Sequence, residues 1–135
     1  MSSLSLTIVT PHGPIESELD ITALTVPGGA GEMGVLPGHT SMAATLKPGL
    51  VHYDVVGEKS ISVFTSGGYV DVQGSNVTLL LDVLEEASGV DFPRARNAQK
   101  RAMERLSSSS SMDLDVPRAL ASLERAQARL QLEHR

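Results

Sequence analysis

Cysteine and tryptophan are absent from this 135-residue chain, and tyrosine and phenylalanine together supply only four residues. Without cysteine the chain can form no disulfide, no thiolate metal site and no cysteine nucleophile. With so few aromatic rings it lacks the stacking platforms that bind sugars or nucleic acids. No run of about 18 apolar residues exists, so the sequence predicts no membrane-spanning helix. Hydrophobic residues still make up 41% of the chain, which predicts an aliphatic core.

The patterns of common catalytic sites are missing as well. The four histidines are scattered without the spacing of metal ligands, so we expect no metal site. No serine lies in a G-x-S-x-G context, and the sequence alone nominates no Ser/His/Asp set. Asp82, Glu85 and Glu86 are close in sequence, but solvation at a strand end explains them without an acid–base pair. We therefore predict that the chain is not an enzyme on its own.

Charge divides the chain into two parts. Residues 1–90 contain two basic and ten acidic residues, whereas residues 91–135 contain nine basic and six acidic ones. An acidic body followed by a basic segment indicates two functional parts. Because the body is acidic and the basic segment has no DNA-reading motif, nucleic acid is not an expected partner.

Apolar residues alternate with polar ones from Leu4 to about Val83, and Gly/Pro turn signals recur roughly every 8–12 residues. This pattern predicts an antiparallel β-sandwich over residues 1–88 and no helix before residue 90. Beyond it the apolar period becomes helical. The fold class is therefore α+β, with the sandwich followed by a two-helix antiparallel hairpin over residues 91–135.

The two helical segments are copies of one another. Val90–Leu106 aligns with Leu114–Leu130 at an offset of 24, with eight identities in seventeen positions. Asp91 and Asp115 occupy the expected N-cap positions, each followed by a proline in the first turn. A run of five serines, Ser107–Ser111, separates the copies and predicts a turn or flexible loop.

The predicted hairpin has a weak core of its own. Its apolar stripes are narrow and consist largely of alanine, which buries little area at roughly 25 cal/mol per Å². Isolated helices of this length are marginal in water. We therefore expect the hairpin to be able to detach from the sandwich and extend along a partner.

Arginines recur on one face of each predicted helix, within a stripe about 40° wide. Facing stripes could hold an anion or nucleotide, because guanidinium forks suit phosphate oxygens. The alternative is a solvated face with local pairs to Glu104 and Glu124. The stripes comprise Arg94, Arg101 and Arg105 on the first helix, and Arg118, Arg125 and Arg129 on the second.

A Gly/Pro-rich stretch, Pro27–Gly49, holds six of the twelve glycines and three of the seven prolines. It predicts tight turns around a short buried segment, with Met33 and Leu36 in the core. Its GEMGVLPGH and LKPG blocks, with SGGYVDV and NVTLL further on, resemble the epsilon subunit of F-type ATP synthases. The resemblance extends over nearly the whole chain.

The resemblance implies a subunit of the central stalk at the cytoplasmic face of the bacterial inner membrane, held at the membrane only through its complex. The sandwich would bind the gamma subunit and the c-ring. The hairpin would extend toward the alpha and beta subunits and inhibit ATP hydrolysis. Two other classes stay open: a free-standing ATP-sensing module that uses the arginine hairpin, and a small β-sandwich hydrolase or sugar binder with a helical tail.

The resemblance also implies specific contacts. No cofactor is required, but some bacterial members of the family bind ATP as a regulatory ligand. The sequence contains no Walker-type loop, so ATP hydrolysis is not predicted. The nucleotide motif of those members resembles Ile/Leu-Asp-x-x-Arg-Ala, which reads Val90-Asp91-Phe92-Pro93-Arg94-Ala95 in this chain. The chain departs from it at Val90, a shorter aliphatic residue, and at Pro93, which lacks a backbone N–H. The matching nucleotide positions are Glu85, Val90, Asp91, Arg94, Ala95, Arg101, Arg125 and Arg129. The implied c-ring contact comprises Glu32, Gly34, Pro37, Gly38 and His39.

Overall fold

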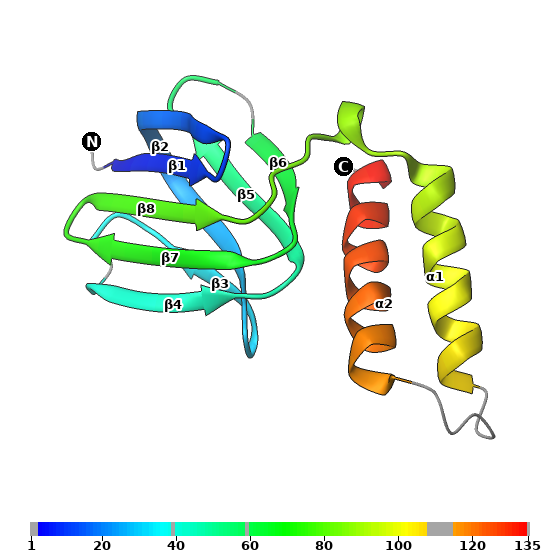
Figure 1. Cartoon of the computed structure of the whole chain (residues 1–135). Coiled ribbons are helices and arrows are strands. Elements are labelled where there is room, and N and C mark those ends of the chain that lie inside the picture. Colours follow the sequence, from blue (N-terminus) through cyan, green and yellow to red (C-terminus); the bar gives the residue numbers. More distant parts are fainter. Residues whose placement is uncertain (1–2, 39, 59, 108–114, 135) are drawn as a thin grey trace.

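A computed structural model describes residues 3–38, 40–58, 60–107 and 115–134 of the chain (Figure 1). Eight strands form the first part and two helices the second, so the predicted fold class is confirmed. The helices are α1 (Phe92–Ser107) and α2 (Val116–Gln131), with short 3-10 turns at Ala87–Gly89 and Leu132–His134. The strands are β1 (Leu4–Thr10), β2 (Gly13–Gly28), β3 (Gly31–Val35), β4 (Met42–Leu46), β5 (Gly49–Val55), β6 (Ser60–Thr65), β7 (Gly68–Gln73) and β8 (Asn76–Leu81).

Strand β2 is 16 residues long and connects the two layers of the sandwich. Its first half pairs with β1, and its second half pairs with β3 and β5. Register shifts in the β1–β2 ladder and a positive φ of 51° at Glu18 mark the bend between the halves. Strands β1, β8, β7 and β4 form the front layer in Figure 1, and β2, β5 and β6 lie behind it. Every strand pairing is antiparallel except β1–β8, among the strands that the structure describes.

The main core fills the space between these layers and is aliphatic, as the composition predicts. Leu6, Ile8 and Val70 are fully buried there. Tyr53 is the only aromatic residue among the buried members of this core. Burial, with a smaller effect from the carboxylates of Glu16 and Glu86, raises the pKa of Tyr53 to about 12. Its phenol therefore stays neutral throughout the physiological range.

Both helices begin where the sequence predicts. Asp91 Oδ1 accepts a hydrogen bond from the Arg94 backbone N–H at 3.0 Å, and Asp115 Oδ1 accepts one from Arg118 at 3.1 Å. Each bond satisfies an N–H that the helix leaves unpaired at its first turn. Most of the serine run predicted to be a turn, Ser108–Ser111, lies outside the described residues.

A second, smaller core joins the hairpin to the sandwich. Leu50 of β5 and Phe64 of β6 pack against Ala128 and Leu132 at the end of α2, and Val90 and Phe92 pack at the edge of this cluster. In Figure 1, α2 lies beside β5 and β6, and α1 is the outer helix. The small size of this contact agrees with a hairpin that can separate from the sandwich, which remains a prediction.

Two local predictions were wrong. Leu36 is 60% exposed instead of buried, because strand β3 ends at Val35 and Leu36 already belongs to the following turn. Met33, by contrast, is partly buried against the main core. A helical turn also precedes residue 90, since Ala87–Gly89 forms a 3-10 turn that leads into α1.

Candidate anion-binding site between the helices

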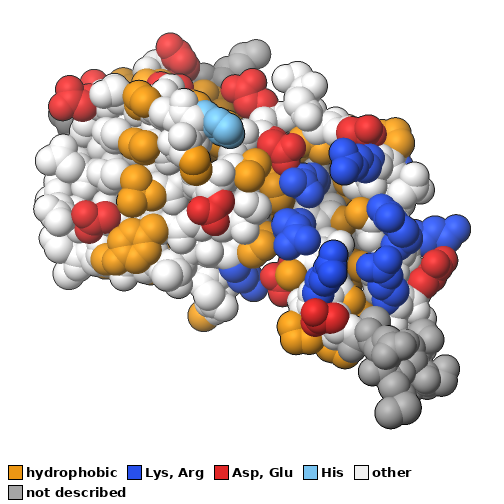
Figure 2. All heavy atoms as spheres, viewed as in Figure 1, with side chains coloured by type: hydrophobic (Ala, Val, Ile, Leu, Met, Phe, Trp, Pro, Cys, Tyr) orange, Lys and Arg blue, Asp and Glu red, His pale blue; other side chains and the backbone are white. Residues whose placement is uncertain are grey.

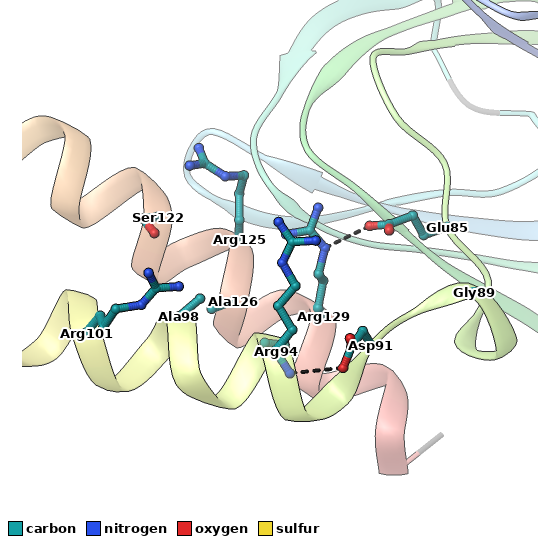
Figure 3. Close-up of a pocket in the computed structure, with 11 residues that line it drawn as sticks. Glu85, Gly89, Asp91, Arg94, Ala98, Arg101, Ser122, Arg125, Ala126 and Arg129 are labelled. Atoms are coloured by element: carbon teal, nitrogen blue, oxygen red, sulfur yellow. Dashed lines mark hydrogen bonds and ion pairs between the residues drawn. The ribbon is translucent and has the colours of Figure 1, made fainter.

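A pocket of about 360 Å³ lies between α1, α2 and the end of the sandwich (Figure 3). Arg94 and Arg101 line it from α1, and Arg125 and Arg129 line it from α2. The arginine stripes therefore face one another, as the helical spacing allows. Figure 2 shows the same grouping on the surface, with Lys and Arg side chains concentrated on the hairpin and few on the sandwich. The remaining lining residues are Glu85, Gly89, Asp91, Ala95, Ala98, Ser122 and Ala126.

Glu85 links the pocket to the sandwich. Its backbone N–H and C=O both bond to Phe64 of β6, at 2.9 and 2.8 Å. Its carboxylate Oε1 accepts a hydrogen bond from Arg129 Nε at 2.7 Å, and the same guanidinium lies over the Phe64 ring, 4.4 Å from its centroid. Both side chains are less than one-third exposed. Arg129 is thus held in place by an ion pair and a cation–π contact.

The pocket carries an excess of positive charge. Four guanidinium groups line it, against the carboxylates of Glu85 and Asp91. Within the described residues Glu85 pairs with Arg129, whereas Arg94, Arg101 and Arg125 have no ion-pair partner. Cations gathered in this way repel one another unless an anion lies between them. The arrangement therefore suits an anion with several oxygens, such as a phosphate chain.

Comparison with known proteins identifies the family. Residues 3–87 match the beta-sandwich domain of the ATP synthase delta/epsilon chain, and residues 89–132 match its long alpha-helix domain. The chain belongs to the ATP synthase delta/epsilon chain family. The family resemblance in the four sequence blocks is thereby confirmed.

Curated relatives of this delta/epsilon chain are named ATP synthase epsilon chain. The protein of Bacillus velezensis is 38% identical over 130 residues, which is 96% of each chain. The Bacillus subtilis protein is 41% identical over 86% of each chain. The Nitratidesulfovibrio vulgaris protein is 40% identical over 96% of this chain and 95% of its own. The chain is therefore of the epsilon type.

Solved structures share its fold. A chain in the Euglena gracilis mitochondrial ATP synthase OSCP/F1/c-ring assembly superposes with a TM-score of 0.86 at 23% identity, over 100% of this chain and 83% of that chain. A chain in the Tetrahymena thermophila mitochondrial ATP synthase central stalk and c-ring superposes with a TM-score of 0.66 at 15% identity, over 95% and 94%.

The structure brings together seven of the eight predicted nucleotide residues of this epsilon-type chain. The exception is Val90, which packs against the second core instead of lining the pocket. Sequence reasoning missed Gly89, Ala98, Ser122 and Ala126, which line the pocket between the arginines. The signal was available for two of them, because Ala98 and Ser122 are equivalent positions of the internal repeat.

The predicted c-ring residues are spread along strand β3 and the turn after it. Glu32 is exposed near the start of β3, where it lines a groove of about 300 Å³ with Lys47 and Glu124 of α2. Gly34 is exposed at a later position of β3, and Pro37 and Gly38 follow the strand's other end. Glu32 therefore lies next to the hairpin, separated by the length of β3 from Pro37. His39 lies outside the described residues.

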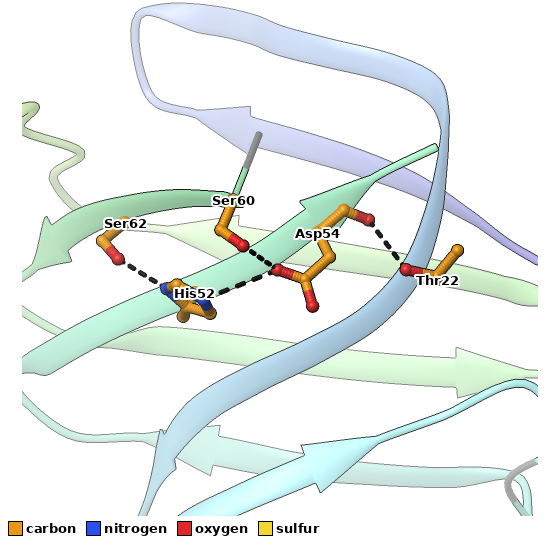
Figure 4. A network of polar contacts seen from close by, with 5 residues as sticks. All are labelled: Thr22, His52, Asp54, Ser60 and Ser62. Carbon is orange, nitrogen blue, oxygen red and sulfur yellow. Dashed lines mark hydrogen bonds and ion pairs between the residues drawn. The ribbon is translucent and has the colours of Figure 1, made fainter. Parts of the chain in front are cut away.

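A polar network that the sequence did not reveal connects β5 and β6 (Figure 4). His52 Nδ1 and Ser62 Oγ are 2.5 Å apart, and the Ser60 hydroxyl donates to Asp54 Oδ1. His52 Nε2 lies 3.6 Å from Asp54 Oδ1, beyond hydrogen-bond distance. The residues are cross-strand partners on one face, so the network stabilises the pairing of β5 with β6.

The described part of the chain has neither a membrane-spanning helix nor a metal-binding cluster. Neither α1 nor α2 is long and apolar enough to cross a membrane. No group of three or more histidine or acidic side chains there is arranged to hold a metal ion.

Proposed function

We propose that this chain works as the epsilon subunit in the central stalk of a rotary ATP synthase, at the cytoplasmic face of a bacterial membrane. The sandwich would bind the gamma subunit and the c-ring, and the chain would carry no catalytic site of its own. The match of both domains to the delta/epsilon family supports this role. So do relatives named epsilon chain that align over nearly their whole length.

The hairpin would be the regulatory part. The observation that carries this proposal is the composition of the pocket: one wall, Glu85, belongs to the segment paired with the sandwich, and the arginines belong to the hairpin. A ligand that contacts both parts binds only while the hairpin is docked. By mass action such a ligand stabilises the docked state and opposes extension toward the alpha and beta subunits.

ATP is the proposed ligand of this pocket. Its volume of about 360 Å³ falls within the range of roughly 300–1,000 Å³ that is usual for small-molecule sites. Arg94, Arg101 and Arg125 would bind the phosphate oxygens, and Arg129 would contribute while it is oriented by Glu85. Binding would be regulatory, because the sequence contains no Gly-rich phosphate loop of the Walker type.

Calorimetric titration of the full chain with MgATP tests the proposal. We expect saturable binding that Arg94→Ala and Arg125→Ala each weaken at least about tenfold, because each removes a charged hydrogen-bond donor. Lys100→Ala is the matched control, since it removes an exposed cation of α1 that does not line this pocket. Equal weakening by all three variants would reduce the effect to general electrostatics and contradict a defined site.

The two N-cap residues separate binding from folding. Asp91→Ala and Asp115→Ala each remove one capping bond, and we expect each to destabilise its helix by about 1 kcal/mol. Only Asp91 lines the pocket. Circular dichroism should therefore show similar losses of helix stability, while MgATP affinity should fall more for Asp91→Ala, because its capping bond holds the backbone of Arg94 and Arg94 lines the pocket. If the affinities fell equally, Asp91 would act only through the helix.

A further inference from the structure

A second arginine-lined pocket of about 170 Å³ lies further along the hairpin, toward the loop that joins its helices. Four guanidinium groups line it, two from each helix, and its described lining contains no acidic side chain. Its lining consists of Ala98, Arg101, Ala102, Arg105, Arg118, Ser122 and Arg125.

The internal repeat explains why this pocket exists. An antiparallel pair of equivalent helices has an approximate twofold axis, so a site built at one end has a counterpart at the other. With the offset of 24, Arg94 and Arg101 correspond to Arg118 and Arg125. Arg125 and Arg129 correspond in turn to Arg101 and Arg105. The four arginines of the first pocket thus map onto the four of the second, and Arg101 and Arg125 belong to both.

The two pockets differ in their counter-charges. The first contains Glu85, which pairs with Arg129, and the capping residue Asp91. The second lacks both, and none of its arginines has an ion-pair partner among the described residues. No acidic side chain of the described residues therefore compensates the charge of the second pocket. A small anion with several oxygens would relieve the repulsion and accept hydrogen bonds from guanidinium groups of both helices.

We propose that this second pocket binds a phosphate group between Arg105 and Arg118, with Arg101 and Arg125 shared with the first pocket. Its volume is about half that of the first, so it suits a single phosphate and not a whole nucleotide. The phosphate could be free in solution or be the terminal group of a phosphate chain anchored in the first pocket. Binding would clamp the two helices together at the end remote from the sandwich.

The test follows the Nε–H NMR signals of the arginines in the full chain during titration with sodium phosphate. A titration with sodium chloride at matched ionic strength corrects for screening. We expect saturable shifts of Arg105 and Arg118 with phosphate. Arg105→Ala and Arg118→Ala should each weaken phosphate binding about tenfold. Lys100→Ala is again the control, and circular dichroism of each variant checks that the hairpin remains folded.

Four outcomes are decisive. If free phosphate still shifts the Arg105 and Arg118 signals to saturation in the Arg94→Ala variant, the second pocket is an independent phosphate site. This conclusion would hold even if no ATP binding to the first pocket were detected. Shifts of Arg105 and Arg118 with ATP but not with free phosphate support the same site filled by a nucleotide's terminal phosphate. Two results would overturn the proposal when ATP also causes no shift at Arg105 and Arg118. One is that phosphate shifts these signals no more than chloride does. The other is that Arg105→Ala leaves the phosphate-induced shifts unchanged.

Discussion

Replacing Phe64 by alanine is expected to release the helical hairpin while the sandwich stays folded. Phe64 is fully buried, but it belongs to the second core and not to the main core. Its ring packs against Ala128 and Leu132 of the hairpin and lies under the Arg129 guanidinium. Truncating a buried phenylalanine costs about 3–5 kcal/mol, and here the loss falls on the contact between the two parts.

Hydrogen exchange measures this release directly. A loss of about 3 kcal/mol should speed exchange of amides in α1 and α2 by roughly a hundredfold, with little change in β7 and β8. Phe64→Leu is the matched control, because it keeps most of the buried volume and removes the ring beneath Arg129. Unchanged helix protection in Phe64→Ala would show that the second core does not hold the hairpin.

This prediction bears on the proposed regulation. The backbone of Phe64 holds Glu85, and its ring supports Arg129, so one residue contacts both halves of the candidate nucleotide site. Release of the hairpin would therefore separate Glu85 from the arginines and lower ATP affinity as well. Conversely, ATP added to the Phe64→Ala variant should restore part of the lost helix protection, since ligand binding favours the docked state.

Local patterns were sufficient to predict the order and type of the elements. Alternation located the strands, and Asp-x-Pro signals located the start of both helices. The family resemblance supplied the individual nucleotide residues, whereas helical spacing only placed the arginines in stripes that could face each other or remain solvated. These features depend on residues near one another in sequence, and on the fixed geometry of a helix pair.

The docking of the hairpin could not be predicted, because it depends on which strand face meets α2. A weak signal was present in Val63 and Phe64, two adjacent apolar residues that break the alternation of β6 and are both buried in the structure. In a strand that is buried on one face only, apolar and polar residues alternate. Consecutive apolar residues therefore indicate that both faces of the strand are covered. The run does not say what covers them. Leu36 shows the opposite error, since an apolar residue in a turn is often exposed.

Gly68→Ala is expected to have the largest effect on the sandwich. Gly68 lies between β4 and β8, paired with Leu46 and Leu81. A β-carbon there would overlap the Leu80 carbonyl oxygen and lie 3.0 Å from Leu81 Cα, and backbone atoms cannot move aside as a side chain can. Strand β7 would have to shift away from β8, so we expect a loss of at least about 3 kcal/mol.

Thermal unfolding should show this loss as a fall in Tm of roughly 10–20 °C. Gly34→Ala is the control, because a β-carbon at Gly34 meets nothing within 4 Å and should leave Tm nearly unchanged. An unaltered Tm in Gly68→Ala would mean that β7 and β8 adapt without cost.

The consequence of this clash extends beyond the strand pair. The Gly67 carbonyl accepts hydrogen bonds from the Asp82 N–H and from the buried Thr65 hydroxyl, at 3.0 and 2.9 Å. These bonds fix the point at which the chain leaves β8 toward Glu85. A displaced β7 would carry this turn with it, so Gly68→Ala should also misplace Glu85 and weaken hairpin docking. Gly34→Ala leaves the turn intact, and its helix protection should match that of the unmodified chain.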